Sequence, residues 1–351
     1  MFNFIQNLRK VKIPFISRAQ IYFDLGTTMT KIAIKNKGVV LREPTYLGLN
    51  TKTKEYVFFG SEAKSIVGKT PDYIKIIRPI IAGVISDFDA EVALIRKFLD
   101  ESVYIYYRNQ LIKPALTAIA IIPSIATEIE QKAIQEVFFK TGISQSFLIE
   151  KSLATAQGCN LNIFSHQPNL IVDLGGGLIE LSVISGGGIV VSKTIKNAGD
   201  YMNKAIYNYV YLKYGIILGD ATCEFLKINL LNFTNQEKTV TIRGKSLETG
   251  LPKSVRIKTS DIREALLPHF NQIIDGIKEL IEASPPEILD ELLKRGIILT
   301  GGLAKIKGID NFFASELKIN VFSAEDPENT TINGLIKLGL NFENILKIAI
   351  R

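Results

Sequence analysis

The sequence predicts an α/β protein made of two similar halves, each with helices covering a mixed sheet. Two observations carry this prediction. A strand, a glycine-containing turn and a second strand occur near residue 21 and again near residue 170, with Asp-Leu-Gly at both turns. Between and after these hairpins, strand-like and helix-like segments alternate. At about 150 residues per domain, a chain of 351 residues also fits two domains.

The first hairpin spans Ile21 to Ile34, and the second spans Leu170 to Ile184. In each, an apolar strand runs into the turn and a second apolar strand leaves it, which is the pattern of a β-hairpin. Asp24 and Asp173 occupy the same place in the two copies. The repetition on the scale of a domain indicates two related halves.

The segments between and after the hairpins predict further elements. Asp87 is the expected N-cap of a helix that runs through Leu99, and Thr127 with Glu130 forms a capping box. The other expected elements are a buried strand over Ala115 to Ile122, a helix end at Thr141-Gly142, an irregular insertion with short strands over Asn232 to Ser260, a helix over Glu287 to Lys294 and a strand over Gly296 to Thr300.

The composition is that of a globular protein and excludes several classes. The chain is 46% hydrophobic and 22% charged, which rules out a mostly disordered protein. Two cysteines and two histidines are too few for a disulfide framework or a His-rich metal site. No apolar run approaches the roughly 20 residues that span a bilayer, and the N-terminus lacks the pattern of a secretory signal. We therefore expect a cytoplasmic protein.

The net charge of +7 favours anionic partners. The lysines are scattered rather than interleaved with aromatic residues, so we expect no dedicated nucleic-acid binding. Residues 1–14 predict a short amphipathic helix, with Phe4, Ile5 and Leu8 on its apolar face. This helix either docks on the protein's own core or lies on an anionic membrane surface, and its flanking cations favour the membrane. One such helix binds weakly, so firm attachment needs assembly.

The turns of the hairpins suit phosphate binding. Glycines let backbone N–H groups approach phosphate oxygens, and the hydroxyls of Thr27 and Thr28 can add hydrogen bonds. Asp24 and Asp173 would repel a polyphosphate unless they hold a Mg²⁺ ion through its waters. A third loop, Leu299 to Gly308, places two glycines between a strand and a helix, where a base or a phosphate could approach the backbone.

Ten further stretches carry a resemblance to a known family. In chain order they are Gly38 to Pro44, Arg78-Pro79, Gly83 to Asp89, Val172 to Gly177, Gly187 to Val191, Ala198 to Asp200, Ile242 to Gly244, Gly250 to Pro252, Leu299 to Gly302 and Ala324 to Pro327. With them the chain resembles MreB, the bacterial actin family, within the superfamily of actins, heat-shock chaperones and sugar kinases. The match runs from about residue 20 to 340 in the family's order.

The resemblance implies an actin-like two-lobed fold, with a smaller inserted subdomain in each lobe and a nucleotide cleft between the lobes. The family binds ATP or ADP with Mg²⁺ and polymerises into antiparallel double protofilaments. It lies on the inner face of the cell membrane and helps set cell shape. The expected divisions are the helix 1–14, a first lobe 15–168 with an insertion at about 42–90, a second lobe 169–340 with an insertion at about 201–265, and a tail 341–351.

The resemblance also implies roles for individual residues. It assigns nucleotide binding to Asp24, Gly26, Thr27, Thr28, Asp173, Gly175, Gly176, Gly177, Glu224, Lys227, Thr300, Gly301 and Gly302, with Asp24 and Asp173 also facing the metal. Leu111 and Ile112 stand where the family has an apolar membrane loop. The preceding stretch from Val103 to Tyr107 is unusually apolar and aromatic, and it either supports this contact or packs under the lobe.

Two positions depart from the family where it orients the water that attacks ATP. Lys151 stands in place of a glutamate, and Leu178 stands in place of a threonine. An ammonium group cannot accept a proton, and leucine has no hydroxyl, so we expect a weak or degenerate ATPase at most. The alternative is an active ATPase in which a neighbouring carboxylate compensates, with Glu150, Glu128 and Glu130 as candidates. The double loss also suggests a paralogue that partners other chains of its family.

Lys31 is a third departure, because the family has an apolar residue there and eukaryotic actin has a phosphate-binding lysine. Lys31 is either a solvated lysine of its strand or an inward-facing cation that adds to nucleotide binding. A chaperone would need a substrate-binding module after the ATPase, and a sugar kinase would need a base for the sugar hydroxyl. Neither is evident, so the sequence favours a filament-forming cytoskeletal protein.

Overall fold

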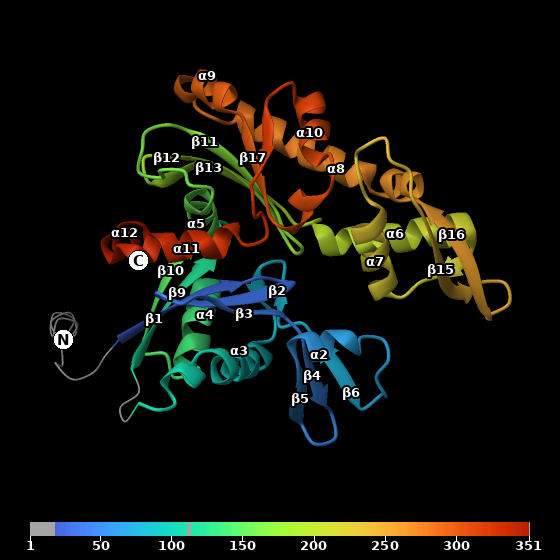
Figure 1. Cartoon of the computed structure of the whole chain (residues 1–351), viewed down its shortest axis with the longest axis horizontal. Helices are drawn as coiled ribbons and strands as arrows, with labels where there is room; N and C mark the ends of the chain where they lie inside the picture. Colours follow the sequence, from blue (N-terminus) through green and yellow to red (C-terminus); the bar gives the residue numbers. More distant parts are fainter. Residues whose placement is uncertain (1–17, 111–113, 351) are drawn as a thin grey trace.

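The computed structural model describes residues 18–110 and 114–350, which form two lobes (Figure 1). Each lobe contains a five-stranded mixed sheet, and the helices α5 (Lys151–Gly158) and α11 (Thr330–Leu340) lie between the two sheets. The two predicted membrane segments, residues 1–14 and Leu111-Ile112, fall outside the described residues. Within the described part of the chain, no helix combines the length and apolarity that crossing a bilayer requires.

The sheet of the first lobe has the strand order β10-β9-β1-β2-β3. Its strands are β1 (Arg18–Leu25), β2 (Met29–Ile34), β3 (Gly38–Pro44), β9 (Ala115–Ile122) and β10 (Gln145–Glu150). β1 pairs antiparallel with β2 and parallel with β9, which confirms the first predicted hairpin and the strand at Ala115 to Ile122.

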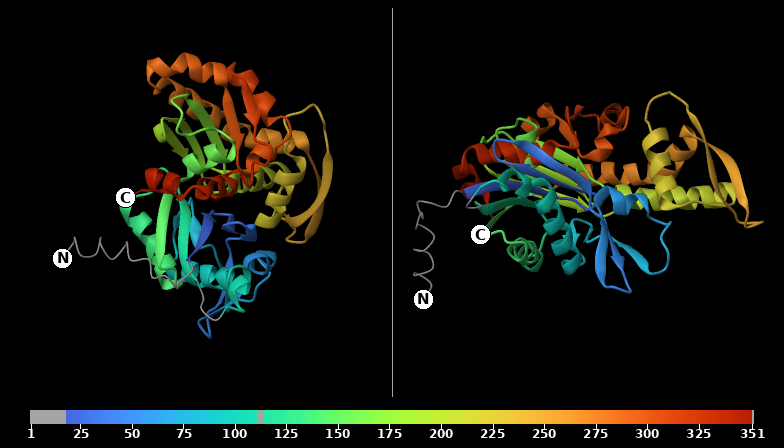
Figure 2. Two further views of the ribbon diagram at one scale, coloured as in Figure 1. Left: turned by 60° about the vertical axis from the view of Figure 1, so that its left-hand side comes forward. Right: turned by 60° about the horizontal axis from the view of Figure 1, so that its bottom comes forward.

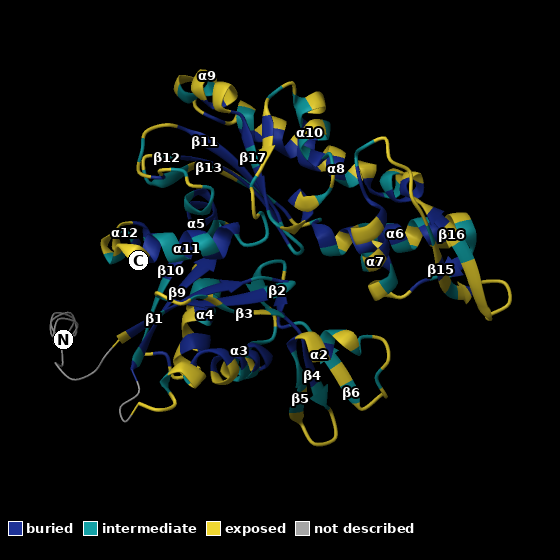
Figure 3. Ribbon diagram, in the orientation of Figure 1, coloured by how far each residue is buried: buried dark blue, intermediate teal, exposed yellow. Residues whose placement is uncertain are grey.

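Helices cover both faces of this sheet, so the strands β1, β2 and β9 are buried along most of their length (Figure 3). Ile21 and Phe23 face a core shared with α3 (Phe88–Ser102) and α4 (Glu128–Lys140). Tyr22, between them, points to the opposite face and packs with residues of α5 and α11. This alternation follows from the period of two residues in a strand.

The sheet of the second lobe has the order β13-β12-β11-β17-β18. Its strands are β11 (Asn169–Leu174), β12 (Ile179–Ser185), β13 (Gly188–Ile195), β17 (Ile297–Thr300) and β18 (Val321–Ser323). The pairing of β11 with β12 is antiparallel, which confirms the second predicted hairpin. The helices of this lobe are α6 (Gly199–Tyr214), α7 (Asp220–Leu230), α8 (Thr259–Glu282), α9 (Pro286–Arg295) and α10 (Ile309–Leu317).

Each lobe carries a small three-stranded sheet at its outer end. The first comprises β4 (Leu47–Asn50), β5 (Glu55–Phe59) and β6 (Ile74–Ile77) with the helix α2 (Gly60–Ser65), and the second comprises β14 (Ile216–Ile217), β15 (Thr239–Ser246) and β16 (Pro252–Lys258). The shorter elements are β7 (Ile80–Ile81), β8 (Val84–Ile85), η1 (Tyr104–Tyr107), η2 (Gly302–Lys305) and α12 (Phe342–Ile348).

The expectation of an irregular insertion over Asn232 to Ser260 was wrong for most of that segment. β15 and β16 form a regular antiparallel hairpin from the pair Thr239 and Lys258 to the pair Lys245 and Pro252. The hairpin projects from the second lobe (Figure 2). Most of its side chains are exposed, so the apolar signal that marks a core strand is weak here.

The helix caps that the sequence predicts are confirmed. Asp87 accepts a hydrogen bond from the backbone N–H of Ala90, and α3 continues three residues beyond the expected end. The side chain of Glu130 accepts from the backbone N–H of Thr127 at 2.7 Å, which completes the capping box of α4. Thr141 ends α4, as expected.

The helices between the lobes approach each other closely because glycines line their contact. A Cβ added to Gly158 of α5 would lie 1.9 Å from the backbone oxygen of Thr330, and one added to Gly334 of α11 would lie 1.7 Å from that of Ala154. α11 follows the second lobe in sequence but packs against β1 and β2 of the first lobe. The chain therefore passes between the lobes twice, first through α5 and then through α11.

The apolar segment before residue 108 divides between core and surface. Val103 is fully buried, and Tyr104 and Tyr107 pack against the core of the first lobe. Ile105 and Tyr106 are 46% and 45% exposed. Packing under the lobe therefore accounts for three of the five residues, and the other two face the surface.

One buried carboxyl group in α3 stands apart from the cleft. Glu91 is fully buried, and neither of its carboxylate oxygens has a hydrogen-bond partner among the described residues. Burial raises the pKa of Glu91 from 4.5 to about 8, because desolvation disfavours the charged form. The folded protein therefore holds Glu91 protonated at neutral pH, whereas the unfolded chain ionises it.

This shift predicts that stability falls as pH rises between about 4.5 and 8, where the folded state binds a proton that the unfolded state has lost. The substitution Glu91→Gln keeps the shape and removes the ionisation. We expect its melting temperature to exceed that of the wild type by several degrees at pH 8, and by less at pH 5. Thermal denaturation across this range measures the difference. The exposed Glu316→Gln is the matched control, and a difference for Glu91→Gln that does not change with pH would contradict the assignment.

Candidate nucleotide-binding cleft

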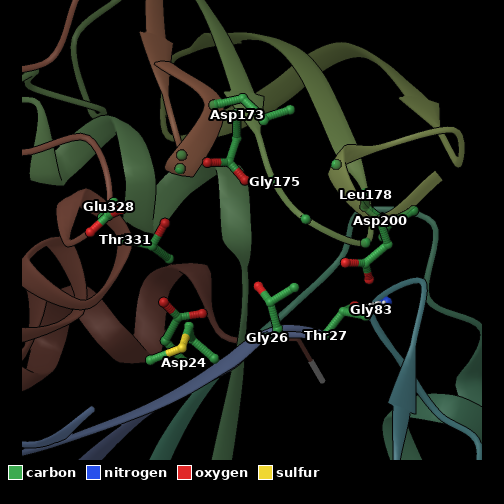
Figure 4. A pocket seen from close by; sticks show the side chains of 18 of the residues that line it. Asp24, Gly26, Thr27, Gly83, Asp173, Gly175, Leu178, Asp200, Glu328 and Thr331 are labelled. Carbon is green, nitrogen blue, oxygen red and sulfur yellow. Dashed lines mark hydrogen bonds between the residues drawn. The ribbon is translucent and has the colours of Figure 1, made fainter. Parts of the chain in front are cut away.

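A cavity of about 330 Å³ lies between the lobes, and residues of both lobes line it (Figure 4). Nearly all of the nucleotide and catalytic residues expected from the sequence meet there. Those that line it are Asp24, Gly26, Thr27, Thr28, Lys31, Lys151, Asp173, Gly175, Gly176, Gly177, Leu178, Glu224, Lys227, Gly301 and Gly302.

The turns of the two hairpins both line this cavity and contact each other at its edge. Each is closed by a backbone hydrogen bond, from Gly26 to Met29 in the first lobe and from Gly175 to Leu178 in the second. A Cβ added to Gly177 would lie 2.1 Å from the hydroxyl oxygen of Thr27 on the opposite turn. Glycine at this position therefore allows the two turns to meet.

Thr300 was expected at the adenosine loop, but the structure places it behind the cavity wall. Its side chain is fully buried, and its hydroxyl donates to Asp173 Oδ1 at 3.0 Å. Thr300 ends β17, which pairs with β11 directly beside Asp173. Thr300 thus contacts the Asp173 carboxylate from behind, while Gly301 and Gly302 line the cavity.

Lys31 points inward and is not a solvated lysine of its strand. It stands opposite Asp24 in the pairing of β1 with β2, and its Nζ lies 2.9 Å from Asp24 Oδ2. The same ammonium group donates to the backbone oxygen of Glu328 at 2.5 Å. The side chains of Lys31 and Asp24 are only 10% and 7% exposed, so this is a buried ion pair.

Lys151, the first residue of α5, is held between two carboxylates of the second lobe. Its Nζ forms an ion pair with Asp173 Oδ2 and lies 3.5 Å from Glu180 Oε2. Burial alone would lower the pKa of Lys151, but the carboxylates of Asp173, Glu180 and Asp24 outweigh it and raise the pKa. Lys151 therefore stays protonated and cannot act as a general base.

Glu180 was not anticipated as a site residue. Its side chain is 1% exposed, and its Oε1 accepts a hydrogen bond from the backbone N–H of Ser124 at 3.0 Å. Burial raises the pKa of Glu180, and the nearby Lys151 opposes this shift. The only sequence signal for Glu180 was its place in the second hairpin, which does not show what the side chain contacts.

The carboxylates considered as substitutes for the lost base do not reach the cavity. Within the described residues, Glu128, Glu130 and Glu150 are absent from its lining. Glu130 is engaged in the capping box. Leu178 does line the cavity, and a Cβ added to Gly83 of the first lobe would lie 2.6 Å from its Cδ1. Leu178 thus fills the space between the lobes with apolar atoms.

Glu224 and Lys227 lie on one side of α7 and both reach the cavity. Glu224 Oε1 lies 3.0 Å from the Nζ of Lys64, which belongs to α2 of the first lobe. Lys227 donates to the backbone oxygen of Gly199 at 2.6 Å and to Asn203 Oδ1 at 2.8 Å. Burial lowers the pKa of Lys227, with nearby carboxylates opposing the shift.

Further ion pairs join parts of the chain that are distant in sequence. Arg78 of the first lobe pairs with Asp200 at the start of α6, and Arg42 pairs with Glu328 in the loop before α11. Arg78 and Asp200 lie in stretches that carried the family resemblance, but their pairing across the cleft had no local signal. No sequence pattern indicated that Glu328 would lie at the cleft.

The donor set fits a magnesium ion only in part. Asp24 and Asp173 supply the two carboxylates that a hydrated Mg²⁺ ion can use, and both line the cavity. Each, however, already contacts a lysine ammonium group. In residues 18–110 and 114–350, no group of three or more His, Cys, Asp or Glu side chains is arranged to hold a metal ion directly.

Known proteins of one family match this chain along almost its whole length. The family model described as MreB/Mbl protein matches residues 18–347. The cell shape-determining protein Mbl of Bacillus cereus is 36% identical over 333 residues, covering 94% of this chain and 98% of its own. The cell shape-determining protein MreB of Escherichia coli is 33% identical over 317 residues, covering 89% and 90%.

Solved structures of MreB and related proteins also match this chain. MreB5 of Spiroplasma citri bound to ADP superposes with a TM-score of 0.88 at 31% identity, covering 94% of this chain and 98% of its own. The same protein bound to AMPPNP gives a TM-score of 0.87. The MamK double helical filament gives 0.76 at 17% identity, which supports the fold alone. These matches confirm the predicted actin-like, two-lobed α/β fold, and the chain belongs to the MreB/Mbl family.

Proposed function

We propose that this chain binds ATP or ADP in the cleft between its lobes. The two glycine turns, with Thr27 and Thr28, would receive the phosphates, and Gly301 with Gly302 would lie against the adenosine. Glu224 and Lys227 would lie near the ribose. Asp24 and Asp173 are the carboxylates that would face a Mg²⁺ ion accompanying the nucleotide. The Spiroplasma citri MreB5 structures bound to ADP and to AMPPNP support this proposal.

We also propose that hydrolysis is weak or absent, and one contact carries this proposal. The ammonium group of Lys151 lies between Asp173 and Glu180, where it cannot accept a proton from water. Leu178 offers no hydroxyl to orient that water. Such a site favours binding of the triphosphate over its cleavage, because positioning of the attacking water supplies most of the catalysis. The second candidate is an active ATPase whose hydrolysis drives filament turnover.

For the assembled protein, we propose a cytoskeletal filament that helps set cell shape. It would form antiparallel double protofilaments, alone or with paralogous chains, on the inner face of the cell membrane. The similarity to the cell shape-determining proteins Mbl and MreB supports the role in cell shape. The net charge of +7 and the amphipathic pattern of residues 1–14 support contact with anionic lipid.

The double substitution Lys151→Glu/Leu178→Thr tests the weak hydrolysis. We expect phosphate release from the purified wild type with saturating Mg-ATP to lie near background. The double variant should release phosphate about 100-fold faster, because it regains a base and a hydroxyl beside the water.

The control Lys132→Glu/Leu340→Thr makes the same chemical changes at exposed positions outside the cleft and should leave the rate unchanged. If the wild type already releases phosphate as fast as the double variant, another group positions the water. In that case the active-ATPase alternative holds.

The double substitution Phe4→Ser/Leu8→Ser tests membrane attachment. We expect the polymerised wild type to co-sediment with vesicles that contain anionic lipid, and the variant to remain in the supernatant, because the apolar face of the helix is lost. The control Asn3→Ser/Asn7→Ser alters the polar face of the same segment and should bind normally. Equal binding by Phe4→Ser/Leu8→Ser and the wild type would exclude this segment as the anchor.

A further inference from the structure

The distribution of charge in the cleft is unusual for a site that faces a polyphosphate and a metal ion. Asp24 and Asp173 occur at matching places in the two hairpins, one in each lobe. Each aspartate has its own lysine: Lys31 for Asp24 and Lys151 for Asp173. Both lysines belong to the lining of the cavity.

These lysines are held in place by the fold. Lys31 is fixed from two sides, by Asp24 of the adjacent strand and by the backbone oxygen of Glu328 in the loop before α11. Lys151 is fixed by Asp173 and Glu180, on two adjacent strands of the second lobe. The side chains of Lys31 and Lys151 are 10% and 18% exposed, so solvent screens their charges little.

The two ammonium groups together carry the charge of one divalent cation. A Mg²⁺ ion in a nucleotide site usually neutralises the phosphates while one or two carboxylates hold it through its water shell. Here the two carboxylates are already neutralised, and a lysine can itself bind phosphate as a point charge. A Mg²⁺ ion would have to share or displace these contacts to reach Asp24 and Asp173.

We propose that Lys31 and Lys151 take over the electrostatic role of the magnesium ion, so that this chain binds ATP almost as tightly without Mg²⁺ as with it. This inference rests on the proposed nucleotide binding and adds that the binding is independent of the metal. The inference concerns the affinity for ATP, so it can be tested by measuring binding without measuring hydrolysis.

Isothermal titration calorimetry with ATP tests the proposal directly. The full-length protein, stripped of nucleotide, is titrated once in excess Mg²⁺ and once in EDTA, and the two dissociation constants are compared. We expect the constants for the wild type to agree within about threefold. A loss of affinity of more than about tenfold in EDTA would overturn the proposal, whatever the variants do.

The double substitution Lys31→Met/Lys151→Met assigns the effect to the two lysines. It keeps much of the side-chain length and frees both aspartates. We expect ATP binding in EDTA to weaken by roughly 10- to 100-fold, the value of one or two hydrogen bonds to a charged group, and Mg²⁺ to restore most of it. A purely structural loss would weaken binding equally in both conditions, so an unchanged ratio of the two constants would refute the assignment.

Two further variants complete the design. Lys31→Arg/Lys151→Arg keeps both charges, and its two constants should stay within about threefold of each other, as for the wild type. Lys294→Met removes a lysine from the exposed surface of α9, and it should change neither constant. Absence of ATP binding by the wild type in both conditions would overturn nucleotide binding itself. Binding only with Mg²⁺ would overturn the metal independence alone.

Discussion

The ion pairs of Lys151 with Asp173 and Glu180 determine the distribution of charge in this cleft. Lys151 begins α5, the helix that lies between the two sheets, so its ammonium group joins that helix to β11 and β12 of the second lobe. The contact also balances two carboxylates that are almost completely buried. A buried ion pair is costly to break by removing one partner, because the remaining charge is left uncompensated.

Under the proposed function, this balance of charge affects both hydrolysis and the binding of a metal ion. With a glutamate in place of Lys151, three carboxylates would meet beside Asp24, and a divalent cation would be needed to hold them together. With lysine there, Asp173 and Glu180 have a cationic neighbour without a metal, and the group at this position cannot accept a proton from water. Lys31 makes the same adjustment at Asp24. The proposed weak hydrolysis and the proposed metal-independent binding would thus both follow from one rearrangement of charge.

The sequence predicted those parts of the structure that depend on local patterns. Both hairpins, the capping box of Thr127 and the glycine turns follow from the period of the strands and from the conformational needs of caps and turns. The cavity lining was predicted because those turns match a known family, position by position. The hairpin β15–β16 was missed because its exposed side chains give little apolar periodicity.

The contacts between distant residues could not be predicted in this way. Glu180 contacts Lys151, and Arg78 contacts Asp200, only because the fold brings the lobes and their helices together. The place of Thr300 in a motif predicted nucleotide binding, but it gave no sign that the hydroxyl donates to Asp173. Whether Lys31 faces solvent or the cavity depends on which way its side chain points from β2. Because β2 is buried on both faces and apolar around Lys31, its sequence pattern does not show this direction.

The identity of the bound nucleotide tests the central claim most directly. The purified protein is mixed with an equal amount of ATP and Mg²⁺ and held for hours. It is then denatured, and the released nucleotide is separated by chromatography. A cleft in which Lys151 replaces the catalytic base predicts that ATP is recovered largely intact. Recovery of ADP in proportion to the protein would show that the cleft completes hydrolysis, which would contradict the account.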